Sequence, residues 1–71
     1  MSKLKDIRKA QGLTQAELAS AAGIQQATVS HLETGSMAIN YTGAATVTRL
    51  ALALGVDITE ILEPGWDRGL K

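Results

Sequence analysis

The stretch that most constrains the fold is residues 14–35, where two short helical patterns meet at one glycine. Thr14 and Glu17 have the spacing of a capping box, in which each side chain binds a free backbone N–H group at a helix start. Gly23 can take the left-handed conformation that ends a helix. The pattern therefore predicts two helices joined by a three-residue turn, at about 15–22 and 26–33.

The second of these helices has two different faces. Val29 and Leu32 within it, and Ile24 in the turn before it, are spaced to point into a core. Its opposite face is polar and uncharged, and consists of Gln26, Ala27, Ser30 and His31. Such a pair of helices is a helix-turn-helix, and a second helix of this kind has the shape that enters a DNA major groove.

The rest of the chain also has helical periodicity, and no alternating strand pattern is found. Further helices are predicted at about 2–11, at about 43–54, and after Asp57 until Pro64 stops the last one. The core must be aliphatic, because the chain has no Phe and only one Trp and one Tyr. We expect an all-α, compact five-helix domain over 1–63, with a C-terminal tail over 64–71.

Composition narrows the possible functions. No cysteine is present, which excludes disulfides and thiolate metal sites, and His31 has no second histidine to share a metal with. No acid–base or nucleophile–base pair stands out, so neither an enzyme nor a cofactor is expected. The chain has no long apolar run and no signal-peptide pattern, which predicts a cytoplasmic protein without a membrane partner.

Several motifs in order resemble the phage-repressor/Cro-type helix-turn-helix family, also called the XRE family. The similarity covers about residues 3–63 and leaves out only the tail. The motifs that carry it are Ile7-Arg8, Gly12-Leu13-Thr14-Gln15-x-Glu17-Leu18-Ala19, Gly23-Ile24, Thr28-Val29-Ser30, Leu32-Glu33-x-Gly35 and Leu50-Ala51-x-Ala53-Leu54-Gly55-Val56.

The resemblance implies a lambda-repressor-like domain from a bacterium or a phage that binds double-stranded DNA, usually as a dimer on a near-palindromic operator. The third helix would be the recognition helix, with Gln26, Ala27 and His31 at positions that reach base edges. Gln15 would contact a phosphate and could brace Gln26. Arg8 and Glu33 would form an ion pair that locks the first helix onto the third.

The side chains at the recognition positions differ in how well they can contact DNA bases. The Gln26 amide can make a bidentate contact to adenine, although a solvated surface glutamine is the plain alternative. Ala27 can offer a methyl group to thymine. His31 could donate to guanine or a phosphate, or take no part. Gln25 stands where the family favours a Ser or Thr cap, so it either caps weakly or is free to reach the bases.

Hydroxyl and amide side chains near the two helices could bind the DNA backbone, because such groups and helix N-termini bind phosphate oxygens. The alternative for each is simple capping or turn formation. The candidates are Thr14, Gln15, Thr28, Ser30, Thr34, Ser36 and Asn40.

Charge is the main departure from the family. The formal net charge is +0, and no Lys or Arg occurs between Lys9 and Arg49. Because phosphate contacts and counterion release carry much of DNA affinity, we expect weak non-specific binding with a shallow salt dependence. The loop from Ser36 to Thr42 is also longer than in the family.

The C-terminal part suggests a homodimer, with an interface formed by Ile58, Leu62, Trp66 and Leu70. In the alternative, the first two are core residues and Trp66 folds over them.

The leading functional hypothesis is a sequence-specific transcriptional regulator, most simply a repressor that occupies DNA. A phage regulator, a restriction-modification controller and an antitoxin with a toxin partner all remain open, as does a contact with RNA polymerase. The rival is a protein–protein interaction module that kept the fold, which the charge gap favours.

Overall fold

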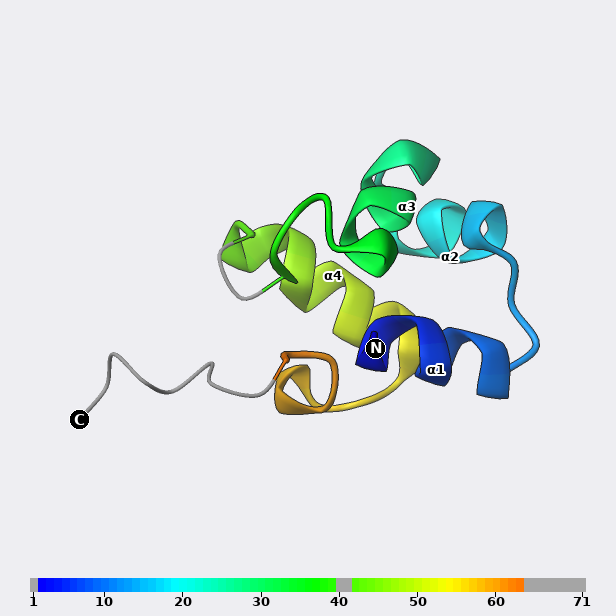
Figure 1. Cartoon of the computed structure of the whole chain (residues 1–71). Coiled ribbons are helices and arrows are strands. Elements are labelled where there is room, and N and C mark those ends of the chain that lie inside the picture. Colours follow the sequence, from blue (N-terminus) through cyan, green and yellow to red (C-terminus); the bar gives the residue numbers. More distant parts are fainter. Residues whose placement is uncertain (1, 40–41, 64–71) are drawn as a thin grey trace.

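The computed structural model describes residues 2–39 and 42–63. Within them the chain forms four α-helices and one short 3-10 helix, without a strand (Figure 1). Their order is α1 (Lys3–Ala10), α2 (Gln15–Ala22), α3 (Gln26–Thr34), α4 (Ala44–Leu54) and η2 (Ile58–Glu60). The all-α prediction is confirmed for this part of the chain, and the first four predicted helices lie within one or two residues of their expected bounds.

The predicted fifth helix is wrong. The capping box that suggested it is present, since Asp57 N–H donates to Glu60 Oε2 at 2.9 Å and Thr59 N–H donates to Asp57 Oδ1 at 3.2 Å. However, it opens only the single 3-10 turn η2. The reason is length, because Pro64 disfavours the α conformation at the residue before it and leaves fewer than two helical turns, too short for a stable α-helix.

The capping box at the start of α2 is formed as predicted. Glu17 N–H donates to Thr14 Oγ1 at 3.1 Å, and Thr14 N–H donates to Glu17 Oε1 at 2.8 Å. At the other end, Gly23 is left-handed with a φ of 69°. The Ile24 N–H then donates back to the Ala19 carbonyl at 3.0 Å, which closes the helix and turns the chain into α3.

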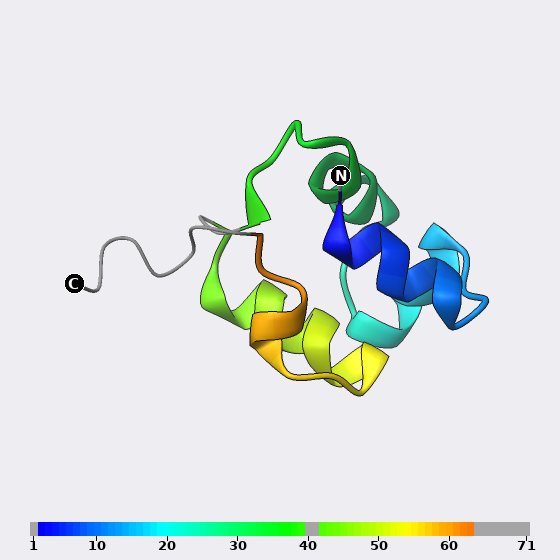
Figure 2. The ribbon, with the colours of Figure 1, turned by 60° about the horizontal axis from the view of Figure 1, so that its bottom comes forward.

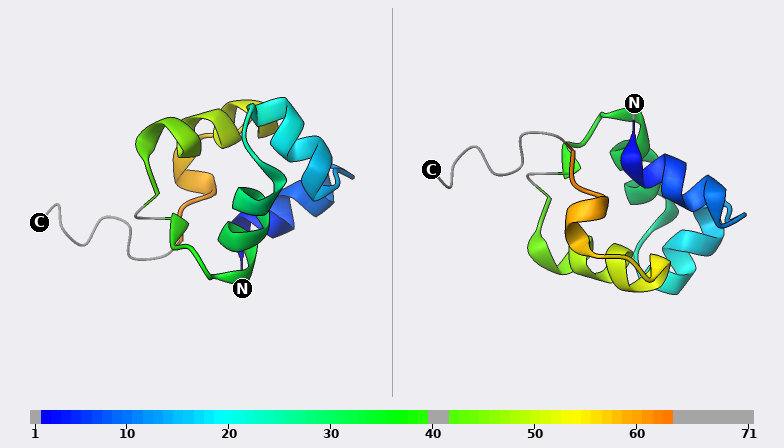
Figure 3. Two further views of the ribbon diagram at one scale, coloured as in Figure 1. Left: turned by 90° about the horizontal axis from the view of Figure 1, so that it is seen from above. Right: turned by 90° about the horizontal axis from the view of Figure 1, so that it is seen from below.

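The core lies where α2, α3 and α4 meet. α2 packs against both of the other helices, and Figure 3 shows α1 and α3 on the side of the domain opposite α4. Apolar side chains from all four α-helices and from Ile61 after η2 fill the centre, and the most deeply buried are Leu4, Leu18, Val29, Leu50 and Ile61. The predicted inward residues of the last α-helix are all buried, as Val47, Leu50, Ala51 and Leu54.

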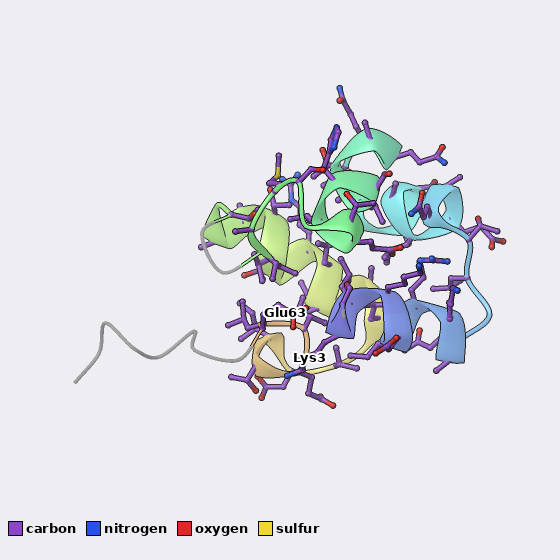
Figure 4. The ribbon with its side chains drawn as sticks, in the orientation of Figure 1. Lys3 and Glu63 are labelled. Carbon is purple, nitrogen blue, oxygen red and sulfur yellow. The ribbon has the colours of Figure 1, made fainter. Side chains whose placement is uncertain are left out.

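The segment after α4 returns to the start of the chain. Figure 2 shows η2 lying against α4, and Figure 4 shows Lys3 and Glu63 close together between η2 and α1. Lys3 N–H donates to Glu63 Oε1 at 3.1 Å, and Lys3 Nζ donates to the Thr59 carbonyl at 3.3 Å. The C-terminal segment therefore holds the N-terminal end of α1. None of the described helices is long and apolar enough to cross a membrane.

Candidate nucleic-acid interface

The N-terminal half of α3 presents a polar, uncharged surface at the edge of the domain. Gln25, Gln26, Ala27 and His31 are all exposed, whereas Val29 on the same helix is fully buried. Figure 4 shows side chains projecting from this end of α3 away from the other helices. The four residues predicted to reach DNA bases are therefore all accessible.

Gln25 occupies the N-cap position of α3, but its side chain makes no capping hydrogen bond. Its backbone is extended, with φ −79° and ψ 145°, and its carbonyl accepts from the N–H groups of Thr28 and Val29. The Gln25 amide is thus available for an outside partner. The helix end also carries the partial positive charge of the backbone dipole, which favours negatively charged ligands.

Arg8 and Glu33 form a bidentate ion pair between α1 and α3. Arg8 Nε lies 2.6 Å from Glu33 Oε2, and Arg8 Nη2 donates to Glu33 Oε1 at 2.9 Å. A third guanidinium nitrogen, Nη1, donates to the Leu13 carbonyl at 2.7 Å. The two side chains are 9% and 1% exposed, so the pair is buried. The Arg8 guanidinium is therefore not available to contact DNA phosphates.

The surroundings keep this pair charged. Burial acts to raise the pKa of the Glu33 carboxyl, but the hydrogen bonds from Arg8 and Gln15, together with the charges of Arg8 and Lys5, outweigh it and lower the pKa below its usual range. The hydrogen bond to Glu33 likewise raises the pKa of Arg8, against the effect of burial. Glu33 is therefore ionised at neutral pH.

Gln15 is also bound to this carboxylate. Its Nε2 donates to Glu33 Oε1 at 3.0 Å, from the first residue of α2. The contact joins residues 18 positions apart, and the sequence offers no local signal for it. Sequence reasoning singled out both residues, but it gave them separate roles and missed that they touch.

The hydroxyl candidates fall into different environments. Thr14 Oγ1 is engaged in the capping box, while Thr34 Oγ1 donates to the His31 carbonyl at 3.3 Å and lies 3.1 Å from Ser36 Oγ. Thr28 and Ser30 are partly exposed on α3. Asn40 lies outside the described residues. Capping therefore accounts for Thr14, while Thr34 and Ser36 are joined to each other just at and after the C-terminal end of α3.

A helix-turn-helix family model matches residues 4–61. The chain belongs to the helix-turn-helix family of the phage-repressor/Cro (XRE) type. Its members are DNA-binding regulators of transcription, and α2 and α3 supply the motif here. No curated protein sequence matches the chain.

Among solved structures, the regulator is similar to the restriction-modification controller protein C.AhdI from Aeromonas hydrophila. The two chains are 28% identical, and the superposition has a TM-score of 0.76. It covers 84% of this chain and 86% of the other. The likeness therefore extends over most of both chains.

The regulator's helix-turn-helix carries no cation of its own. No Lys or Arg lies between Lys9 and Arg49, and Arg8 is committed to Glu33. The exposed cations among the described residues are Lys5 and Lys9 on α1 and Arg49 on α4. Positive charge thus flanks the motif rather than occupying α3. Within the described residues, no group of three or more His, Cys, Asp or Glu side chains is placed to hold a metal ion.

The predicted dimer residues are only partly described. Ile58 and Leu62 are half-buried and pack against the regulator's own core, which leaves part of each side chain accessible. Trp66 and Leu70 lie outside the described residues. The largest exposed apolar side chains in the described part are elsewhere, at Leu52 on α4 and Met37 in the loop after α3, which are 75% and 41% exposed.

Proposed function

We propose that this regulator binds specific DNA sequences as a homodimer, on a near-palindromic operator, with α3 in the major groove. The observation that carries the proposal is the accessible, uncharged polar face at the N-terminal half of α3, on a helix-turn-helix that is held rigidly by a buried ion pair. A helix of this shape fits the major groove, where each base pair displays a distinct set of donors and acceptors.

Base recognition is assigned to the exposed residues of this face. Gln26 is suited to adenine, because a carboxamide can donate to N7 and accept from the N6 amino group in one bidentate contact, which contributes about 1–3 kcal/mol of discrimination. Gln25 is free of a capping role and can reach a neighbouring base. Ala27 can contact a thymine methyl group, and His31 can donate to guanine or a phosphate.

Uncharged groups around α2 and α3 would hold the DNA backbone. Side-chain hydroxyls, amides and helix N-termini all bind phosphate oxygens. The residues proposed for this role are Thr14, Gln15, Thr28, Ser30, Thr34, Ser36 and Asn40. With so few cations nearby, specificity depends more on these hydrogen bonds than on charge.

A two-fold dimer would place two copies of α3 on successive major grooves. The proposed interface is the C-terminal part of the domain, including the accessible sides of Ile58 and Leu62 together with Trp66 and Leu70 of the tail. Pairing two weak readers raises affinity through effective concentration, which suits a motif that lacks positive charge.

The likeness to a restriction-modification controller supports a regulatory role of a similar kind, in a bacterium or a phage. The matched region covers 86% of that controller. We therefore propose that the regulator acts by occupying DNA, as a repressor does.

The test is binding of the purified protein to the DNA upstream of its own gene, measured by fluorescence anisotropy. Gln26→Ala is expected to lose discrimination between this fragment and a random fragment, with an unchanged melting temperature. Ser20→Ala, at another exposed position outside the proposed contacts, serves as the matched control and should bind like the wild type. If the wild type binds no DNA at low salt, the proposal fails and a protein–protein interaction module becomes the better description.

A further inference from the structure

The Glu33 carboxylate serves more than the ion pair. It accepts hydrogen bonds from Arg8 Nε and Nη2 on α1, and its Oε1 also accepts from Gln15 Nε2 on α2 at 3.0 Å. Glu33 itself belongs to α3. One buried carboxylate therefore connects the first three helices, and one of its three donors is a residue proposed to face DNA.

We infer that Glu33 is a positioning residue for DNA recognition, which orients the carboxamide of Gln15 before DNA arrives. This inference rests on the proposed function, because it gives the buried ion pair a part in the reading of DNA. In it, Arg8 fixes Glu33, and Glu33 fixes Gln15.

Chemistry determines which way the carboxamide points. An ionised carboxylate only accepts hydrogen bonds, so the nitrogen of Gln15 must face Glu33. The carbonyl oxygen and the second N–H of Gln15 are then directed away from the ion pair. A hydrogen bond to a charged group is stronger than one between neutral groups, which holds this orientation against rotation.

The helix starts support the same arrangement. The capping box of Thr14 and Glu17 fixes the backbone directly beside Gln15, and the pKa of Glu33 is kept low, so that its carboxylate stays charged. A side chain that is already ordered loses little conformational freedom when DNA binds. Pre-ordering of this kind matters most for a reader that has few cations to add affinity.

A thermodynamic cycle tests the inference. The combined change Arg8→Met with Glu33→Leu removes the carboxylate without changing the net charge, and apolar replacement of a buried ion pair is often tolerated by the fold. Gln15→Leu removes the carboxamide. Each variant should lower affinity for the upstream DNA fragment about tenfold, the scale of one well-placed polar contact.

The triple variant, which carries all three substitutions, tests whether Glu33 acts through Gln15 or independently of it. If Glu33 acts through Gln15, adding Gln15→Leu to the double change should cause no further loss, because both changes remove the same contribution. If the losses multiply to about a hundredfold, the two sites act independently and the inference is overturned.

Gln11→Leu is the matched control, because Gln11 also donates its side-chain Nε2 to another part of the fold, the Leu54 carbonyl at 2.7 Å. It should lower the melting temperature and leave the preference for the upstream fragment over random DNA unchanged. An equal loss of preference in this variant would show a general structural effect and overturn the inference.

Nuclear magnetic resonance of the wild type gives a second measurement that needs no variant to fold. One side-chain amide proton of Gln15 should exchange slowly with solvent, and the two protons should have well-separated shifts. Fast exchange of both protons would overturn the inference. This readout does not require DNA, so the two failures are distinguishable: absence of DNA binding defeats the proposed function, whereas fast exchange of both protons defeats the ordering of Gln15 by Glu33.

Discussion

Glu63 binds the start of the first helix of the domain, because its Oε1 accepts the backbone N–H of Lys3 at 3.1 Å across 60 residues of sequence, next to the N-cap residue Ser2. The carboxylate lies at the helix N-terminus, where the backbone dipole favours negative charge. Lys3 strengthens the junction through its Nζ, which donates to the Thr59 carbonyl. This pair of contacts explains how a segment with only one 3-10 turn stays attached to α1.

Removing this contact should destabilise the domain. We expect Glu63→Ala to lower the free energy of unfolding by about 1 kcal/mol, the usual effect of losing a helix cap. Urea unfolding followed by circular dichroism measures this change. Thr48→Ala, at an exposed position in α4, should have no comparable effect. Equal midpoints for Glu63→Ala and the wild type would show that the contact contributes nothing.

Arg8→Ala should be far more damaging. It leaves the Glu33 carboxylate buried without its cation, which typically costs about 3–5 kcal/mol. In a chain of 71 residues this change should lower the melting temperature strongly or prevent folding. Differential scanning calorimetry provides the measurement. A melting temperature close to that of the wild type would disprove the importance of the buried pair.

The lowered pKa of Glu33 gives stability a definite pH dependence. The folded-state pKa lies below the ordinary value of 4.5, so the stabilisation is fully present above that value and is lost as pH falls through the folded-state pKa. Urea unfolding at a series of pH values between neutral and strongly acidic should show this loss. Glu33→Gln should be less stable at neutral pH and should lose less on acidification. Parallel curves for the two proteins would contradict the assignment.

The first four helices and the core could be predicted because their signals are local. The capping box at Thr14, the glycine at Gly23 and the apolar spacing of α4 each act within a few residues. The prediction of a fifth helix is wrong for a related reason. A capping box marks where a helix begins, but it does not say how far the helix continues before a proline such as Pro64.

The contacts between distant residues could not be predicted in the same way. Arg8 and Glu33 were paired only through the family resemblance, and the bond between Gln15 and Glu33 was missed. A glutamine at the start of a helix can bind solvent, DNA or a neighbour equally well, so only the packing of three helices determines its partner. The same holds for Lys3 and Glu63, which no motif connects.

Salt should weaken DNA binding only slightly, because α2 and α3 carry no Lys or Arg. Anisotropy titrations at several salt concentrations give the slope of log affinity against log salt. Ser30→Lys, which adds one cation to α3, should steepen the slope by about 0.9 for each copy of the protein bound. A wild-type loss of about 10³-fold or more between about 50 and 200 mM salt would indicate six or more phosphate contacts, against this expectation.

Charge substitutions at two apolar positions test dimerisation separately from folding. Leu62 is half-buried and belongs to the proposed interface, whereas Met37 is 41% exposed in the loop after α3 and lies outside it. A buried charge opposes association, so Leu62→Glu should shift the protein toward monomer and weaken operator binding, while Met37→Glu should change neither. Light scattering over a range of concentrations measures the mass, and circular dichroism verifies that both variants remain helical. A wild type that is monomeric at every concentration, and still binds a full operator as a single copy, would exclude the two-fold arrangement.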